Sequence, residues 1–268
     1  MQDLPARHRE FLTAALSAWR AHPDILGVLA GGSFLSRSMD EFSDLDLVLV
    51  VSDTLRASIA QERTGIARAA GPLLQGFTGE HVGEPRLLIC LYGPPLLHVD
   101  LKFISVSELG SRIEDPEILF ERDGVISERL RATQAKPLEA PTAQWIEDRF
   151  WVWIHYGIDK IRRGELFECL DMLAFLRAQA LAPLISLIDG GLFRGVRRLD
   201  TSRHASALAR TCAQPETEDC LRAMAAAVEC YASLRGQLPA AAAPRPSPAE
   251  PAVRAYLTEV SESGQRKH

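Results

Sequence analysis

The sequence lacks the patterns that mark several large classes of protein. Its five cysteines are odd in number and show no Cys-x-x-Cys spacing, so we expect neither a disulfide framework nor a zinc site. The formal net charge is −5 and the arginines are scattered, so nucleic acid is not an expected partner. No run of about 18 apolar residues is evident, and charged residues interrupt the first twenty positions. We therefore expect no membrane span, no export signal and a cytoplasmic location.

Two familiar nucleotide-binding motifs are also missing. The chain has no Gly-x-x-x-x-Gly-Lys-Ser/Thr loop and no Gly-x-Gly-x-x-Gly fingerprint. What the sequence does have is length and apolar content. Its 268 residues, of which 47% are hydrophobic and 24% charged, are enough to bury a sizeable core and to form two domains.

The first half of the chain alternates apolar runs with amphipathic stretches. Apolar positions at helical spacing predict helices over 5–22 and 54–69. Short apolar runs predict strands over 25–30, 45–51, 86–92, 96–104 and 117–124. Gly93, Pro94 and Pro95 separate the two long strands, which indicates an antiparallel pair, whereas the Gly/Pro-rich segment 71–85 is expected to be a connection without a strand.

A helical bundle is expected to follow. From Trp145 onward apolar residues recur at helical spacing and predict four helices or so. After Gln237 a Pro/Ala-rich stretch precedes one short helix over 252–260. The sequence therefore predicts an α+β fold. It consists of a mixed sheet flanked by helices in 1–138, a helical bundle in 139–236, and a linker and tail in 237–268.

Three aspartates interrupt apolar strands. Because side chains alternate along a strand, Asp44 and Asp46 share one strand face, and Asp100 lies mid-strand on the face of Lys102. Carboxylates beside apolar residues are costly to desolvate and repel one another, so a hard divalent cation, Mg²⁺, is the expected partner. We expect the three carboxylates to converge on one metal site. The alternatives are solvent exposure on an edge strand and, for Asp100, an ion pair with Lys102 or an arginine.

A glycine turn follows the first predicted strand. Gly31, Gly32 and Ser33 predict a tight turn into a short helix, whose free N–H groups would bind an anion such as a phosphate. Glycine lets the backbone approach a ligand closely, and Ser33 offers both a hydroxyl and an amide. The alternative is a simple turn in which Ser33 caps the helix.

Together these residues resemble the signature of the polymerase-β-like nucleotidyltransferase superfamily. The matching parts are Gly32-Ser33, ten intervening residues, Asp44-Leu45-Asp46-Leu47, and Val99-Asp100-Leu101. The later stretch "FWVWIHYGIDKIRRGELFECLDMLAFLR" is similar to the helical domain of bacterial aminoglycoside (streptomycin-type) adenylyltransferases. It differs in reading "LDML" where those enzymes tend to have a histidine after the aspartate.

The resemblance implies a set of roles. ATP, or another nucleoside triphosphate, would be the co-substrate with Mg²⁺, and the three strand aspartates would be catalytic metal ligands. Asp171 would be the general base, and its apolar helical neighbours Phe167 and Phe175 would suit that role; an interhelical salt bridge is the alternative. Lys102 and Lys160 are further candidate contacts for the triphosphate, with ordinary surface charges as the alternative.

We therefore expect an enzyme that transfers AMP, or another nucleoside monophosphate, from Mg·ATP to a hydroxyl group of a small molecule and releases pyrophosphate. The resemblance and the acidic charge balance favour an aminoglycoside-like acceptor, held by the helical bundle. The alternatives are a protein or tRNA acceptor, as in toxin–antitoxin enzymes of the superfamily, and an inactive scaffold that binds nucleotide.

Overall fold

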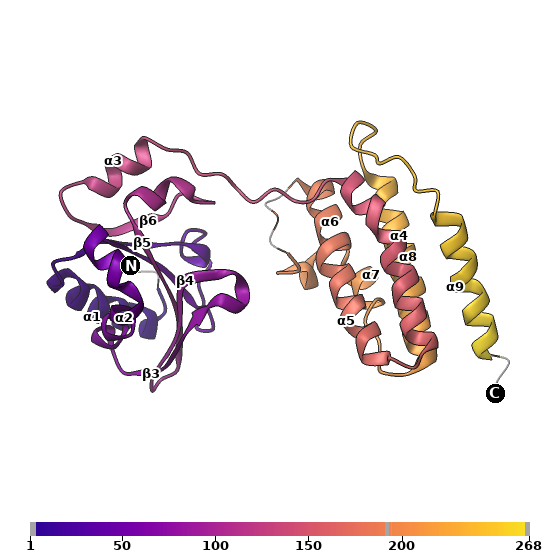
Figure 1. Cartoon of the computed structure of the whole chain (residues 1–268), viewed down its shortest axis with the longest axis horizontal. Helices are drawn as coiled ribbons and strands as arrows, with labels where there is room; N and C mark the ends of the chain where they lie inside the picture. Colours follow the sequence, from indigo (N-terminus) through magenta and orange to yellow (C-terminus); the bar gives the residue numbers. More distant parts are fainter. Residues whose placement is uncertain (1–3, 191–192, 194, 266–268) are drawn as a thin grey trace. The chain divides into compact units, whose positions relative to one another are not determined.

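The computed structural model describes residues 4–190, 193 and 195–265. The chain divides into two compact units, Met1–Pro137 and Leu138–His268 (Figure 1). Each unit has its own hydrophobic core. The first unit combines helices with a mixed sheet and the second is helical, so the predicted α+β fold is confirmed.

The first unit is built on a six-stranded sheet with the strand order β3-β4-β5-β2-β1-β6. β2 and β5 run parallel, and the other neighbouring strands are antiparallel. The strands are β1 Ile25–Ala30, β2 Leu45–Val51, β3 Leu73–Gly79, β4 Glu84–Tyr92, β5 Leu97–Ser105 and β6 Glu117–Glu121. The helices are α1 Ala6–Ala21, α2 Asp53–Ala70 and α3 Val125–Arg131, with short turns η1 Gly32–Phe34, η2 Glu80–Val82 and η3 Ser107–Ser111.

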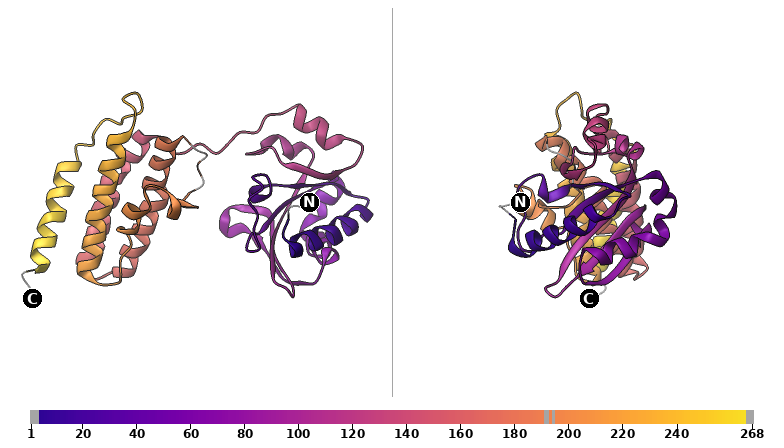
Figure 2. Two further views of the ribbon diagram at one scale, coloured as in Figure 1. Left: turned by 180° about the vertical axis from the view of Figure 1, so that it is seen from behind. Right: turned by 90° about the vertical axis from the view of Figure 1, so that its left-hand side faces the viewer.

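Helices cover the two faces of this sheet differently. α1 and α2 lie against one face, where Leu45 and Leu49 of β2 are buried (Figures 1 and 2). α3 and η3 cover part of the opposite face, where Val50 packs with Ile126. Asp46 points to this second face because it alternates with the buried leucines. The start of β2 therefore presents its polar side chains where the helical cover is incomplete.

One strand was not predicted. The segment 71–85 was expected to be a connection, but β3 pairs antiparallel with β4 and places Thr78 opposite Leu88. β3 is an edge strand with only one buried residue, and it contains two glycines, so it lacks the apolar alternation of a central strand. The antiparallel pairing of β4 with β5 is confirmed.

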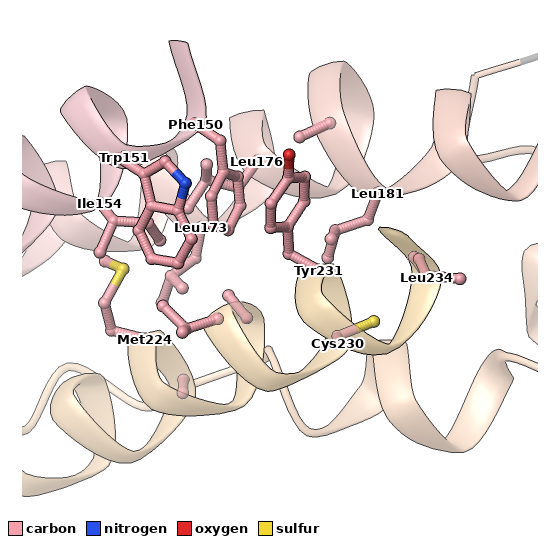
Figure 3. Close-up of a cluster of buried hydrophobic side chains, with 14 of the residues drawn as sticks. Phe150, Trp151, Ile154, Leu173, Leu176, Leu181, Met224, Cys230, Tyr231 and Leu234 are labelled. Atoms are coloured by element: carbon pink, nitrogen blue, oxygen red, sulfur yellow. The ribbon is translucent and has the colours of Figure 1, made fainter. Parts of the chain in front are cut away.

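The second unit is a set of helices around an aromatic core. Phe150 and Trp151 lie against Tyr231, and the Phe150 and Tyr231 rings stack with centroids 3.8 Å apart (Figure 3). The elements are α4 Ala143–Arg162, α5 Leu166–Leu176, a π-helical turn Arg177–Leu181, α6 Ala182–Asp189, η5 Leu199–Thr201, α7 Ala205–Ala209, α8 Thr217–Gln237 and α9 Glu250–Gln265.

The segment expected to be a linker and tail belongs to this unit instead. α9 buries Val253 and Leu257 in the helical core. A buried carboxylate connects the same parts, because Glu147 of α4 accepts hydrogen bonds from Arg235 Nη1 of α8 at 3.0 Å and from the Ser247 N–H at 2.9 Å. Burial raises the pKa of Glu147, but its hydrogen bonds outweigh burial and the net pKa is lowered, so the group is charged at neutral pH.

One helical stretch is more apolar than the sequence analysis allowed. The continuous run Leu166–Asp189 contains an 18-residue window with a mean hydropathy of 1.4, so the expectation that no segment is long and apolar enough for a membrane is wrong. In this window 44% of the residues are buried inside the unit, including Leu173 and Leu176 in its core. Packing against α4 and α8 accounts for the apolar content of a core helix.

Replacing Glu147 tests how the segment before α9 is held. We expect Glu147→Gln to lower the free energy of unfolding by about 2 kcal/mol, because a neutral amide accepts weaker hydrogen bonds from Arg235 and from the Ser247 N–H, while Arg235 keeps its ion pair with Glu250. Urea unfolding followed by circular dichroism would measure this. Asp148→Asn, an exposed neighbour on the same helix, is the matched control and should stay within about 0.5 kcal/mol of wild type. Equal effects of the two substitutions would contradict the prediction.

Candidate functional site

The strand order of the first unit brings four chain segments together at one end of the sheet. β5, β2, β1 and β6 are neighbours in that order. The start of β2 lies beside the end of β1, and the end of β1 lies beside the start of β6. The glycine turn after β1 therefore lies next to the aspartates at the start of β2 and to the loop that enters β6.

The parallel register of β2 with β5 places two aspartates side by side. Asp46 and Asp100 are direct partners, and partners in register point to the same face of a sheet. Asp44 lies one residue before β2 and is partly exposed, like the other two. The predicted placement of Asp46 and Asp100 on one face is thus observed.

In the described part of the chain, the three carboxylates are not recognised as a metal-binding cluster. No group of three His, Cys, Asp or Glu side chains among the described residues is arranged to hold a metal ion. Asp100 Oδ1 instead lies 2.9 Å from Nε2 of the exposed His98. The predicted convergence of Asp44, Asp46 and Asp100 on one metal site therefore stays a prediction.

The glycine turn is shaped around Asp46. Gly31 donates its N–H to the backbone oxygen of Asp46 at 2.9 Å. Gly32 has φ = +59°, and a Cβ at this position would lie 2.0 Å from Asp46 Oδ2. Only glycine leaves room for the carboxylate and adopts this conformation without strain. Ser33 Oγ is buried and has no hydrogen-bond partner in the described part of the chain.

These features fit the ligands that the sequence predicts. Carboxylate oxygens are the donors that Mg²⁺ prefers, and Asp44, Asp46 and Asp100 supply them at the open end of the sheet face. The unpaired hydroxyl of Ser33 and the N–H of Gly32, which a side chain holds and the backbone does not, suit phosphate oxygens.

A fourth carboxylate that the sequence analysis missed also reaches the turn. Glu114 Oε1, from the loop between η3 and β6, accepts a hydrogen bond from the Gly32 N–H at 2.9 Å. This loop has no periodic pattern and no motif. Only the position of β6 beside β1 brings Glu114 to the glycine turn.

Lys102 is engaged within the protein. Its Nζ lies 2.7 Å from Glu84 Oε2, and Glu84 also binds Arg86. The Arg86 hydrogen bonds and those of Lys102 hold the pKa of Glu84 down, at about 2, so the carboxylate remains charged. Arg86 continues the network to Glu108 at 3.1 Å. In this arrangement Lys102 stabilises the sheet, and its predicted contact with a triphosphate stays a prediction.

The helical unit carries the other two predicted residues. Lys160 lies 2.7 Å from Glu165 and 3.1 Å from Glu168, and these carboxylates raise its pKa. Asp171 is exposed on α5 and forms no salt bridge with a described residue. Its neighbour Phe167 is 77% exposed, so the apolar environment expected around Asp171 is open to solvent, which is a correction to the prediction.

A cavity of about 640 Å³ lies in the same unit. Ala174, one helical turn after Asp171 on α5, is one of its lining residues. Its lining is mainly apolar and includes one guanidinium, Arg177, and one carboxylate, Asp200. The volume is within the range of small-molecule sites.

No family model matches the chain, and no curated protein matches it in sequence. Among solved structures, the chain is similar to an aminoglycoside 6-adenyltransferase from Bacillus subtilis, with 16% identity and a TM-score of 0.41, over 94% of this chain and 97% of that one. It is also similar to a nucleotidyltransferase-like protein from Exiguobacterium sibiricum, with 15% identity and a TM-score of 0.35, over 84% and 76% of the two chains. At these TM-scores neither similarity decides the substrate of this chain.

Substituting Gly32 separates a site defect from a folding defect. We expect Gly32→Ala to push the Asp46 carboxylate away and to weaken Mg·ATP binding at least tenfold in calorimetry. Its cost in stability should be about 1 kcal/mol, because alanine is strained at positive φ. Gly83→Ala is the matched control, since Gly83 has φ = +75° with nothing within 4 Å of an added Cβ. It should lose the same stability and keep wild-type binding; equal binding by both variants would contradict the prediction.

Proposed function

We propose that this chain transfers a nucleoside monophosphate, AMP from ATP, to a hydroxyl group of a small molecule and releases pyrophosphate. The observation that carries the proposal is the register pair Asp46–Asp100 beside the Gly32 turn. Paired carboxylates next to backbone N–H groups suit a ligand that combines a divalent cation with phosphates.

Asp44, Asp46 and Asp100 would hold the metal. When bound, Mg²⁺ would stabilise the negative charge that develops on the reacting phosphate and on the leaving pyrophosphate. Asp100 would first have to give up its contact with His98, a change of side-chain rotamer. The Gly32 N–H and the Ser33 hydroxyl would orient the phosphates by hydrogen bonds.

The helical unit would hold the acceptor. Asp171 is proposed to take the proton of the acceptor hydroxyl. The oxygen of that hydroxyl forms a bond to the α-phosphorus of ATP as the bond between this phosphorus and pyrophosphate breaks. The cavity lined by Ala174, one helical turn later, supports this role. The cavity lining carries one positive side chain, Arg177, and one negative side chain, Asp200, so their charges cancel. The compounds tested as acceptors should therefore include neutral ones as well as aminoglycosides.

Metal-ligand substitutions provide the first test. The full chain would be incubated with labelled ATP, Mg²⁺ and small hydroxyl compounds, with proteins and tRNA as separate arms, and products identified by mass. We expect Asp46→Asn and Asp100→Asn to lower AMP transfer at least 10²-fold while stability is unchanged or raised, because a repelling charge is removed. Asp123→Asn, in an exposed loop at a φ of 53° that asparagine also tolerates, is the control.

The products also decide between the alternatives. AMP on a protein or on tRNA would overturn the small-molecule acceptor. Binding of Mg·ATP with no transfer to any acceptor would indicate a scaffold. Absence of Mg·ATP binding by the wild-type chain would overturn the proposed function as a whole.

Asp171 is tested separately from the metal site. We expect Asp171→Asn to lower acceptor turnover about 10²-fold while the affinity for Mg·ATP stays near wild type, as for a general base that acts on the acceptor. Steady-state kinetics and calorimetry would measure the two quantities. Asp148→Asn, an exposed carboxylate on α4, is the control. Equal losses in turnover and in nucleotide affinity would contradict the assignment.

A further inference from the structure

Glu114 accepts the hydrogen bond of the Gly32 N–H, the donor that a nucleotide phosphate would use under the proposed function. Its Oε1 accepts the Gly32 N–H at 2.9 Å and would lie 3.3 Å from a Cβ added to Gly31. A phosphate oxygen would need the same donor, and an N–H has a single hydrogen to donate. The Glu114 carboxylate and a nucleotide phosphate therefore exclude each other at this amide.

The glycine turn does not depend on Glu114 for its shape. Gly31 already donates its N–H to the backbone oxygen of Asp46 at 2.9 Å. Within the turn, the N–H groups of Phe34 and Leu35 donate to the carbonyl oxygens of Gly31 and Gly32, both at 3.2 Å. Because the backbone is held on both sides of the Gly32 N–H, removing Glu114 leaves the turn in place.

Glu114 also lies beside a second carboxylate. Asp46 Oδ2 approaches the Cα side of Gly32, whereas Glu114 Oε1 binds its N–H. Two carboxylates on one residue repel each other, which weakens the hold of Glu114 on the amide. A ligand that brings a cation to Asp46 and a phosphate to Gly32 would relieve this repulsion as it displaced Glu114.

The loop that carries Glu114 is fixed on its N-terminal side. The Arg112 side chain, which is 9% exposed, donates hydrogen bonds to the carbonyl oxygens of Thr133 at 2.7 Å and Leu130 at 3.1 Å. Arg112 Nε also binds Asp115 Oδ1 at 2.6 Å, across Glu114 in the sequence. With the backbone held in this way, rotation of the Glu114 side chain is enough to vacate the amide.

We propose that Glu114 is an internal competitor of the nucleotide phosphates at the Gly32 amide, so that nucleotide binds only to molecules in which Glu114 has rotated away. This inference rests on the proposed function. The apparent dissociation constant for nucleotide is then the intrinsic one divided by the fraction of molecules in which Glu114 has left the Gly32 N–H. If this fraction is roughly a tenth, the apparent dissociation constant is raised about tenfold.

Three substitutions in the full chain test the competitor. Calorimetry with Mg·ATP, and with Mg²⁺ and inorganic tripolyphosphate, would give the affinities. We expect Glu114→Gln to bind about tenfold more tightly than wild type, because a neutral amide holds the Gly32 N–H less strongly. Glu114→Asp keeps the charge but is too short for the amide, and it should also bind more tightly. Asp123→Asn, in an exposed loop of the same unit, removes the same charge away from the Glu114 loop and should match wild type.

Each outcome decides the matter. Tighter binding by both Glu114 variants, with unfolding free energies unchanged or raised, supports the competitor. Wild-type affinity in Glu114→Asp with tighter binding in Glu114→Gln would reduce the effect to net charge and overturn it. Weaker binding or lower stability in Glu114→Gln would make the residue a support of the turn, which also overturns it. Equal binding by all chains overturns this inference alone, whereas no binding by any of them overturns the proposed function with it.

Discussion

Asp46 and Asp100 lie side by side because β2 and β5 pair in parallel with these two residues in register. Like charges directly opposite each other destabilise a sheet, so the pairing costs stability in the resting fold. The surroundings leave room for the two carboxylates. α3 and η3 cover only part of this sheet face, and Gly32 leaves space for the Asp46 carboxylate. A substitution that relaxes the repulsion would stabilise the sheet and remove the pair on which the proposed chemistry depends.

The sequence predicted the strands of this site well because the local physics is strong there. Alternation of leucines with aspartates in β2 predicts which face Asp46 occupies, and the glycines predict the turn. The register of β2 against β5 is a long-range property, set by how separate segments pack, and no local pattern contains it. Glu114 was missed for the same reason, since it reaches Gly32 from a position 82 residues away in the sequence.

Ion pairs account for other differences between sequence and structure. Lys102 and Lys160 both follow patterns that suggested phosphate contacts, yet each is held by carboxylates of its own unit. Arg235 has a comparable role in the helical unit, where it joins Glu147 to Glu250 and so connects α9 to the bundle. Tertiary contacts decide which partner a charged side chain binds, and no local pattern contains them. For this reason the Pro/Ala-rich composition before α9 did not indicate that this segment belongs to the core.

The same ion pairs bear on how an anion would be recognised at the site. Lys102 forms an ion pair with Glu84 at 2.7 Å. Arg37, which follows the glycine turn, forms an ion pair with Glu117 at 3.1 Å. Under the proposed function, phosphate recognition would therefore rest on backbone N–H groups and on the cation that the nucleotide carries, with less contribution from side-chain cations. In a site of this kind, phosphate binding depends most directly on whether the backbone N–H groups are available to donate. A carboxylate on the Gly32 N–H would compete for the donor itself, so under this proposal a single residue, Glu114, would be sufficient to regulate access without any movement of the sheet.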